Sequence, residues 1–164
     1  MENWELHLRL IEARDNNRIA SIIREVMTAY DCVGEGYSIE DDEVDAMFEV
    51  YTLPYGKYFV VSDKAGTVYG GAGINILEGG DSSICELKKM YFLPAIRGKG
   101  WGRKILQSCL LAAKEMGYKQ CYLETVDRMK EANALYVKMG FTQIFKSLGC
   151  TGHNSCDSYY VKNV

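Results

Sequence analysis

The chain has 164 residues, a length that predicts one domain with a hydrophobic core of its own. Its 48% hydrophobic and 25% charged residues are typical of a globular protein and exclude a disordered or collagen-like chain. The formal net charge of -3 gives the chain as a whole no electrostatic affinity for nucleic acid or an anionic membrane, so we expect neither as a partner. Any anion that the protein binds must be held by a local group of positive charges.

Hydropathy and cysteine spacing indicate the cellular compartment. No apolar run approaches the roughly 18 residues of a membrane-spanning helix, and the first residues lack the basic and then apolar profile of a secretory signal. We therefore expect a cytoplasmic protein. The six cysteines include no CxxC pair, which predicts reduced thiols. Cys150, His153 and Cys156 are spaced like three metal ligands but lack a convincing fourth, so the sequence predicts no metal.

The N-terminal third begins with a strand and two helices. Leucines alternate with polar residues from Leu6 to Glu12, which predicts a strand. Asp15 is expected to cap a helix whose apolar stripe runs from Ile19 to Tyr30. A glycine-bearing loop over residues 31–38 follows. The acidic stretch Ile39 to Tyr51 predicts a second helix.

Three consecutive strands form the middle of the chain. We expect them at Lys57 to Asp63, Thr67 to Leu77 and Ser83 to Leu93, joined by tight turns into an antiparallel meander. The run Gly70-Gly71-Ala72-Gly73 lies inside the second strand. Glycines at such a place indicate a β-bulge or a close approach of another group to the backbone.

The C-terminal part alternates helices and strands. Helices are predicted at Gly100 to Met116 and Lys130 to Met139; strands are predicted at Lys119 to Thr125, Phe141 to Leu148 and Ser158 to Val161. Strand, helix and strand in succession predict a right-handed parallel crossover. The fold class is therefore α/β (α+β): a single domain over residues 1–164 with a mixed central β-sheet, an antiparallel N-terminal meander, a βαβ crossover and flanking helices.

Glycine and positive charge come together between the meander and the helix that follows it. Gly98, Gly100 and Gly102 stand at alternate positions, and their missing Cβ atoms would let backbone N–H groups converge on one ligand at the positive end of the helix dipole. Four basic residues accompany them: Arg97, Lys99, Arg103 and Lys104. The segment predicts a cradle for a ligand with several phosphates. A flexible turn with a solvated basic edge is the alternative.

Two common phosphate motifs do not fit this segment. A P-loop requires GxxxxGK followed by Ser or Thr, and the chain has no such string. A dinucleotide fingerprint requires GxGxxG in a parallel unit, whereas these glycines have another spacing and follow a meander. ATP and NAD are therefore not expected.

The segment Leu93 to Gly102 resembles the acetyl-CoA pyrophosphate-binding motif of the GNAT family of N-acetyltransferases. That motif reads Gln or Arg, two variable positions, Gly, one variable position, then Gly or Ala, and Arg97, Gly100 and Gly102 satisfy it. The resemblance extends to 86–92 and 132–141, and the order of elements matches over essentially the whole chain. It implies a GNAT-like domain that transfers an acetyl group from acetyl-CoA directly to a primary amine of a small molecule in a ternary complex, without a metal.

The resemblance also implies catalytic roles. Glu86 is expected to be the base that takes the proton of the amine, because burial on its strand would raise its pKa; Glu124 and a water chain are the alternatives. Tyr136 resembles the acid that protonates the CoA sulfur, although core packing alone would explain its spacing. Asn133 matches a position that bonds the pantetheine arm, with a simple surface residue as the alternative.

Two further sets of residues follow from the resemblance. The acetyl-CoA contacts are expected at Met90, Tyr91, Phe92, Arg97, Gly98, Lys99, Gly100, Trp101, Gly102, Arg103 and Asn133. The acceptor amine is expected between residues 30–51 and 148–157, with Tyr30, Glu124 and His153 as candidate contacts. His153 would meet an acceptor carboxylate or act as an auxiliary base, unless it is a surface residue. The acidic residues of 35–45 would attract a cationic amine or form a solvated face.

Other functions remain open at this point. The glycine cradle would also suit a non-catalytic acyl-CoA-binding regulatory module, although Glu86 and Tyr136 favour an enzyme. The acceptor could instead be a protein or peptide amine. A homodimer is possible, but no feature of the sequence determines the oligomeric state.

Overall fold

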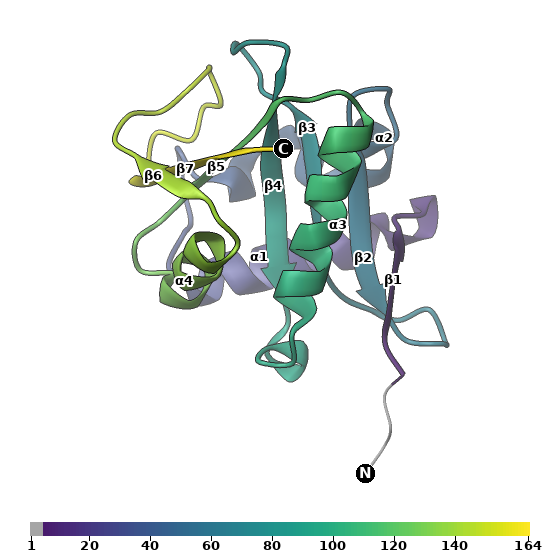
Figure 1. The fold of residues 1–164 in the computed structure, drawn as a ribbon. Helices are drawn as coiled ribbons and strands as arrows, with labels where there is room; N and C mark the ends of the chain where they lie inside the picture. The colour runs from purple at the N-terminus through teal and green to yellow at the C-terminus, as the bar shows by residue number, and fades with distance from the viewer. Residues whose placement is uncertain (1–4) are drawn as a thin grey trace.

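A seven-stranded mixed β-sheet forms the centre of the computed structural model, which describes residues 5–164 (Figure 1). The strands are β1 (His7–Leu10), β2 (Lys57–Ser62), β3 (Val68–Ile76), β4 (Ile84–Phe92), β5 (Gln120–Thr125), β6 (Thr142–Ile144) and β7 (Ser158–Asn163). They lie in the order β1-β2-β3-β4-β5-β7-β6. Of these neighbours, β4 and β5 are parallel and the other pairs are antiparallel. The predicted meander and crossover are thus confirmed.

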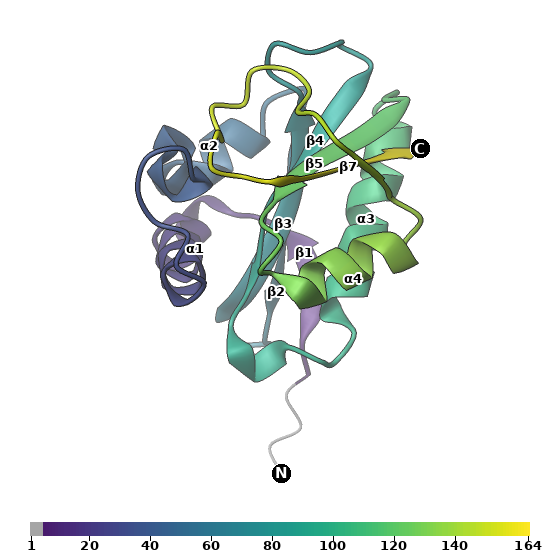
Figure 2. The ribbon, with the colours of Figure 1, turned by 90° about the vertical axis from the view of Figure 1, so that its left-hand side faces the viewer.

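Helices cover both faces of the sheet (Figure 2). α1 (Asn16–Ala29) and α2 (Met47–Tyr51) lie on one face, and α3 (Trp101–Glu115) and α4 (Lys130–Lys138) lie on the other. Each face carries its own apolar cluster, and the predicted stripe of α1 is buried from Ile19 to Met27, whereas Tyr30 follows the helix and is half-buried. Within residues 5–164, no helix has the length and apolar character needed to cross a membrane.

Two local predictions in the N-terminal part are wrong. Asp15 does not cap α1 with its side chain, because its carboxylate accepts hydrogen bonds from Arg9 at 2.7 and 3.0 Å and from the Glu12 N–H at 2.8 Å. The predicted helix over 39–51 is instead two 3₁₀ turns, Ser38–Glu40 and Asp42–Asp45, followed by the short α2. Two of its acidic side chains, Asp41 and Glu43, bind lysines of β4.

One C-terminal prediction is too long. The strand expected over 141–148 is confined to β6, and the chain then leaves the sheet at Phe145, whose side chain is 91% exposed. The segment 145–157, between β6 and β7, arches over the end of the sheet at which β4 begins (Figure 2). This position matters because the segment reaches the candidate site.

The glycines of β3 have both expected properties. A Cβ on Gly71 or Gly73 would lie 2.5 Å from the ring of Tyr58, so these positions need glycine for close packing. Gly71 pairs with Tyr91 and Gly73 with Lys88, which leaves one extra residue on β4 and makes a β-bulge there. Within the bulge, Lys89 has a left-handed φ of +53°. The Tyr58 hydroxyl donates a hydrogen bond of 2.7 Å to the Lys89 carbonyl and so supports this geometry.

The parallel pair at the centre of the sheet is short. β4 and β5 pair only where Ile84, Cys85 and Glu86 face residues 120–122. Beyond Glu86 the two strands separate, and their remaining lengths form opposite walls of a cleft. Because the bulge bends β4 at the same place, both features of the backbone contribute to this opening.

Candidate active site

Two adjoining cavities occupy the opening between β4 and β5. The larger has a volume of about 300 Å³ and lies beside the N-terminus of α3. The smaller has a volume of about 60 Å³ and lies under the segment 145–157, beside Glu86 and His153. The linings of the two cavities have Met90, Tyr91, Met129 and Ala132 in common. A ligand in the larger cavity can therefore reach a second ligand in the smaller one.

The glycine turn lines the larger cavity as a preformed cradle. Gly98 and Gly100 have φ values of +69° and +84°, and a Cβ built on either meets nothing within 4 Å. The space in front of them is therefore open to a ligand. α3 begins at Trp101, directly after Gly100, so the free N–H groups of its first turn are at this place. Free N–H groups and the helix dipole together favour an anion.

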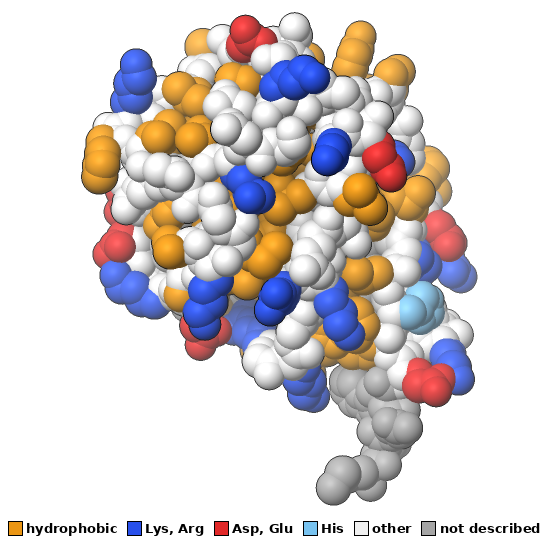
Figure 3. Space-filling model, viewed as in Figure 1, with side chains coloured by type: hydrophobic (Ala, Val, Ile, Leu, Met, Phe, Trp, Pro, Cys, Tyr) orange, Lys and Arg blue, Asp and Glu red, His pale blue; other side chains and the backbone are white. Residues whose placement is uncertain are grey.

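Positive side chains surround the cradle. Arg97 and Arg103 line the cavity. Arg97 donates from Nε to the Phe92 carbonyl at 2.9 Å, and its guanidinium lies 5.8 Å from the centre of the Tyr30 ring. On the face that carries α3, Lys and Arg side chains predominate over Asp and Glu (Figure 3). The local charge is thus opposite in sign to the net charge of -3.

Most of the residues predicted to contact acetyl-CoA line this cavity: Met90, Tyr91, Phe92, Arg97, Gly98, Gly100, Trp101, Gly102 and Arg103. Tyr30, a candidate acceptor contact, lies here as well. Lys99 and Asn133 are not part of the lining. The Asn133 amide donates to the carbonyls of Val126 and Met129, and its oxygen accepts from the Tyr160 hydroxyl at 2.8 Å. These bonds already occupy the polar atoms of the side chain. The contact of Asn133 with a pantetheine arm stays a prediction.

Glu86 forms the floor of the smaller cavity. Its side chain lines the cavity although the residue is only 3% exposed, and no residue in the range 5–164 forms a hydrogen bond or ion pair with its carboxyl group. Burial raises the pKa of Glu86 to about 7, with the charge of Lys88 opposing and that of Glu124 adding to the shift. The group can therefore take up or release a proton near neutral pH.

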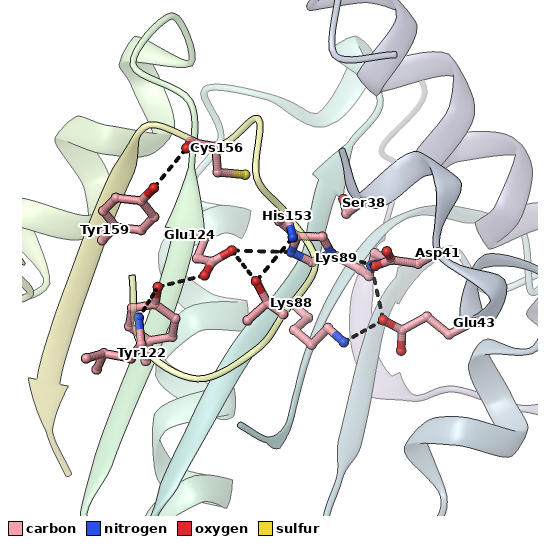
Figure 4. A network of polar contacts seen from close by, with 12 residues as sticks. Ser38, Asp41, Glu43, Lys88, Lys89, Tyr122, Glu124, His153, Cys156 and Tyr159 are labelled. Carbon is pink, nitrogen blue, oxygen red and sulfur yellow. Dashed lines mark hydrogen bonds and ion pairs between the residues drawn. The ribbon is translucent and has the colours of Figure 1, made fainter. Parts of the chain in front are cut away.

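A chain of paired charges reaches the cavity that Glu86 lines. Figure 4 shows Asp41, Glu43, Lys88, Lys89 and His153 of this chain. The buried Lys89 ammonium binds Asp41 at 2.5 Å and Glu43 at 3.1 Å, and Lys88 binds Glu43 at 2.6 Å. His153 continues the chain: its Nε2 lies 2.8 Å from Asp41 Oδ2. These contacts attach residues 38–45 to the bulge of β4. Two carboxylates of the acidic stretch, Asp41 and Glu43, therefore bind side chains of the sheet and do not belong to a solvated face.

Glu124 and His153 join the chain from the other side. Glu124, on β5, accepts hydrogen bonds from the hydroxyls of Tyr122 and Thr151, both at 2.7 Å, and its Oε2 lies 3.5 Å from His153 Nδ1. His153 is only 8% exposed and lies against the smaller cavity. The alternative of a surface histidine is therefore wrong. The predicted candidates Glu86, Glu124 and His153 all come together here.

The protonation states in this chain follow from its contacts. Burial alone would lower the pKa of His153, but the hydrogen bonds to Asp41 and Glu124 outweigh it and raise this pKa to about 9. Burial opposes the ionisation of Asp41, yet His153 and Lys89 hold its pKa down to about 2. The pKa of Glu124 is also below its ordinary value, because its hydrogen bonds overcome its burial. Glu86 is therefore the carboxyl of this group that titrates near pH 7.

Tyr136 lies where the two cavities adjoin. It lines the smaller cavity, and its hydroxyl lies 3.9 Å from the Met90 sulfur, a residue common to both linings. Its ring packs against Phe141 and Tyr160, so the core role is present as well. Burial raises the pKa of Tyr136 above its ordinary value and keeps the phenol protonated.

The segment 145–157 forms part of the wall of the smaller cavity through His153 and Cys156. The Leu148 N–H donates to the Tyr122 hydroxyl at 3.0 Å, and the Ser155 N–H donates to the Gly36 carbonyl at 3.1 Å. The segment therefore spans from β5 to the loop after α1. Sequence reasoning missed the binding partners of this cover; it also missed Lys89 as a site residue and the pairing of Asp41 and Glu43 with it. The two adjacent lysines inside a strand with buried neighbours were the signal that could have found them.

Comparisons with known proteins agree with this geometry. Residues 54–143 match the family described as acetyltransferase (GNAT) domain. The N-acetyltransferase YjgM of Escherichia coli strain K12 is 47% identical over 151 residues, which cover 92% of this chain and 90% of YjgM. The chain belongs to the GNAT family of acetyltransferases. Membership of this family makes the protein an acyltransferase.

Solved GNAT structures have the same fold. An acetyltransferase of Streptococcus agalactiae superposes with a TM-score of 0.82 at 18% identity, covering 97% of this chain and 98% of its own. YncA of Salmonella typhimurium, solved with its cofactor acetyl-CoA, has a TM-score of 0.78 at 20% identity over 97% and 94% of the two chains. At such identities the likeness shows the fold. The roles of individual residues in this GNAT protein have to come from its own site.

Proposed function

We propose that the protein transfers an acetyl group from acetyl-CoA directly to a primary amine of a small molecule while both are bound. One observation carries this proposal: a cleft with open space before the N-terminus of α3 adjoins a smaller cavity lined by the buried carboxyl group of Glu86, which has no partner among residues 5–164. The first cavity suits a phosphate-bearing thioester, and the second suits an amine that must lose a proton before it can attack.

The residues of the larger cavity fit acetyl-CoA. Gly98 and Gly100 leave open space before the N-terminus of α3, and Arg97 and Arg103 supply charge for the phosphates. Apolar side chains, among them Leu135, line the rest of the cavity and fit the uncharged arm of the molecule. Acetyl-CoA supplies an acetyl thioester that is activated toward an amine.

The smaller cavity supplies the proton acceptor. Glu86 is the stronger candidate base, because its carboxyl is unpaired and its pKa of about 7 lets it be ionised while still basic. Glu124 is less suitable, since hydrogen bonds from Tyr122 and Thr151 stabilise its ionised form and lower its pKa, which makes it a weaker base. Tyr136 keeps its proton and is placed between the cavities to donate it at Oη to a departing thiolate. The backbone N–H groups of Met90 to Phe92 are proposed as donors to the thioester oxygen.

The cover over the smaller cavity favours a small acceptor. This cavity has about 60 Å³, a fifth of the volume of the larger one. It therefore suits the amine end of a molecule better than a bulky group. The ion pair between His153 and Asp41 attaches the segment 145–157 above it, which supports a free amine over the side chain of a large partner.

The test combines a binding measurement with turnover on a panel of amines, followed by release of the CoA thiol. Wild-type protein is expected to bind acetyl-CoA in calorimetry and to acetylate at least one small amine. Glu86→Gln should keep the acetyl-CoA affinity and lose roughly 100-fold or more in kcat, the usual contribution of a general base. Glu115→Gln, an exposed carboxylate at the end of α3, serves as the matched control and should behave like wild type.

Two results would contradict the proposal. Absence of acetyl-CoA binding at millimolar concentration would remove the cosubstrate and with it the reaction. Unchanged turnover of Glu86→Gln on an accepted amine would show that another group, such as Glu124, takes the proton.

A further inference from the structure

Three potential metal ligands converge in the smaller cavity. One carboxylate oxygen each of Glu86 and Glu124 and one ring nitrogen of His153 lie within 4.8 Å of one another. The three residues come from β4, from β5 and from the segment 145–157, so the fold brings them together from distant parts of the chain. Carboxylate oxygens and imidazole nitrogens both bind zinc, and catalytic zinc sites use three protein ligands with an open fourth position.

The outer contacts of these residues are those of a metal site. His153 Nε2 lies 2.8 Å from Asp41 Oδ2, while its Nδ1 faces Glu124 at 3.5 Å. Metal-bound histidines usually donate their other N–H to such a carboxylate, which orients the ring. Glu124 is oriented as well, by the hydroxyls of Thr151 and Tyr122. Two of the three potential ligands are therefore held in place before any ion binds.

A second, independent observation is the state of Glu86. Its carboxyl lines the cavity on a residue that is 97% buried, and among residues 5–164 it has no hydrogen-bond or ion-pair partner. A buried carboxylate without a partner is energetically costly, and coordination of a metal is one of the ways in which proteins compensate it. The group is thus a free ligand pointing at the place where Glu124 and His153 also meet.

The ammonium groups of Lys88 and Lys89 work against a cation but do not occupy its ligands, whereas the His153 ring, whose pKa is raised to about 9, has to release a proton when it binds an ion. Lys88 and Lys89 lie next to the cavity. Their ammonium groups bind Asp41 and Glu43, not Glu86 or Glu124. The carboxylates that would face the ion are therefore not neutralised by these lysines. The charges of the lysines lower the affinity of the site for a cation, but their ammonium groups do not occupy it.

We propose that Glu86, Glu124 and His153 bind a divalent transition-metal ion, Zn²⁺ in preference to Mg²⁺, and that the bound ion excludes the acceptor amine. Imidazole favours zinc over magnesium, which prefers oxygen ligands and keeps several waters. The cavity of about 60 Å³ has room for an ion and one water. Binding of the ion is independent of the proposed function, whereas the inhibition rests on it, because the ion would occupy the proposed base.

The experiment measures Zn²⁺ binding by calorimetry on the full chain without a histidine tag, after removal of metals with a chelator. We expect one site per chain and weaker binding of Mg²⁺. His153→Gln and Glu124→Gln should each lower the Zn²⁺ affinity at least tenfold. His7→Gln is the matched control, because His7 is the other of the two histidines in the chain and lies on the edge strand β1. Cys156→Ser, a second control that removes a thiol at the cavity, should leave the affinity unchanged.

A second measurement needs no variant. Zn²⁺ should inhibit acetylation competitively with the amine and leave the dissociation constant of acetyl-CoA unchanged. Equal Zn²⁺ affinity in wild type and His153→Gln, loss of binding in Cys156→Ser, or noncompetitive inhibition would each overturn the assignment. If acetyl-CoA binds and Zn²⁺ does not, this inference fails while the proposed function stands; if acetyl-CoA does not bind, the proposed function fails irrespective of the metal.

Discussion

The open space before Gly100 leads to a prediction that separates binding from stability. Gly100 begins α3 and Gly117 follows its end, with φ values of +84° and +89°, and a Cβ on either glycine meets nothing within 4 Å. Substitution by alanine should therefore cost the same at both positions, about 1–2 kcal/mol for a left-handed residue with a Cβ. For a chain of this size each kcal/mol corresponds to about 2–4 °C in Tm.

The two variants should differ in affinity for acetyl-CoA. At Gly100 the added methyl group occupies the space in which the phosphates are proposed to lie, whereas at Gly117 it points to solvent at the opposite end of the helix. We expect Gly100→Ala to weaken binding at least tenfold, equivalent to about 1.4 kcal/mol, and Gly117→Ala to bind like wild type. Calorimetry gives the affinities, and thermal unfolding gives the stabilities. Equal affinities of the two variants would refute the assignment of the cradle.

Three further predictions concern the smaller cavity and apply in buffer containing a chelator. Tyr136→Phe should keep the acetyl-CoA affinity and the Tm, because among residues 5–164 the hydroxyl forms just one weak hydrogen bond, to the Met90 sulfur at 3.9 Å. The variant should lower kcat, and unchanged turnover would exclude the acid role. The kcat/KM of wild type should rise with pH through about 7, as Glu86 loses its proton. If this rise, the acid limb of the pH profile, persists in Glu86→Gln, it belongs to the titration of another group. The pKa of His153 in the folded protein is raised to about 9, so protonated His153 stabilises the fold fully below the ordinary pKa of histidine, and this stabilisation is lost as the pH rises through 9. In urea titrations, the difference in unfolding free energy between wild type and His153→Gln should therefore become smaller over this pH range. A difference that does not change with pH would contradict the ion pair with Asp41.

The parts of the fold that depend on neighbours in sequence could be predicted. The alternation in β2 to β4, the apolar stripe of α1 and the glycines before α3 are local patterns, and each lies where it was expected. Glu86 was also predictable as a buried acid, because its neighbours Cys85 and Leu87 are core residues. Local periodicity and chain geometry determine these features.

The paired charges depend on contacts that no local pattern contains. Asp41 binds Lys89, 48 positions away, and His153, 112 positions away. In the sequence, the acidic stretch around Asp41 resembles a solvated helix; in the fold, the buried ammonium of Lys89 turns these carboxylates inward and the helix breaks into 3₁₀ turns. The requirement to pair a buried charge thus outweighs the local helical preference.

Pairing also explains why Glu86 can act as a base. Glu43 binds both Lys88 and Lys89, so neither ammonium is free to pair with Glu86. Removing the charge of Glu43 should therefore release Lys88, which already opposes the rise in the pKa of Glu86. We expect Glu43→Gln to move the acid limb of kcat/KM below pH 7, whereas Glu49→Gln, at an exposed carboxylate beside Asn16, should leave it in place. A limb that stays at the wild-type position in Glu43→Gln would show that burial alone determines the basicity of Glu86.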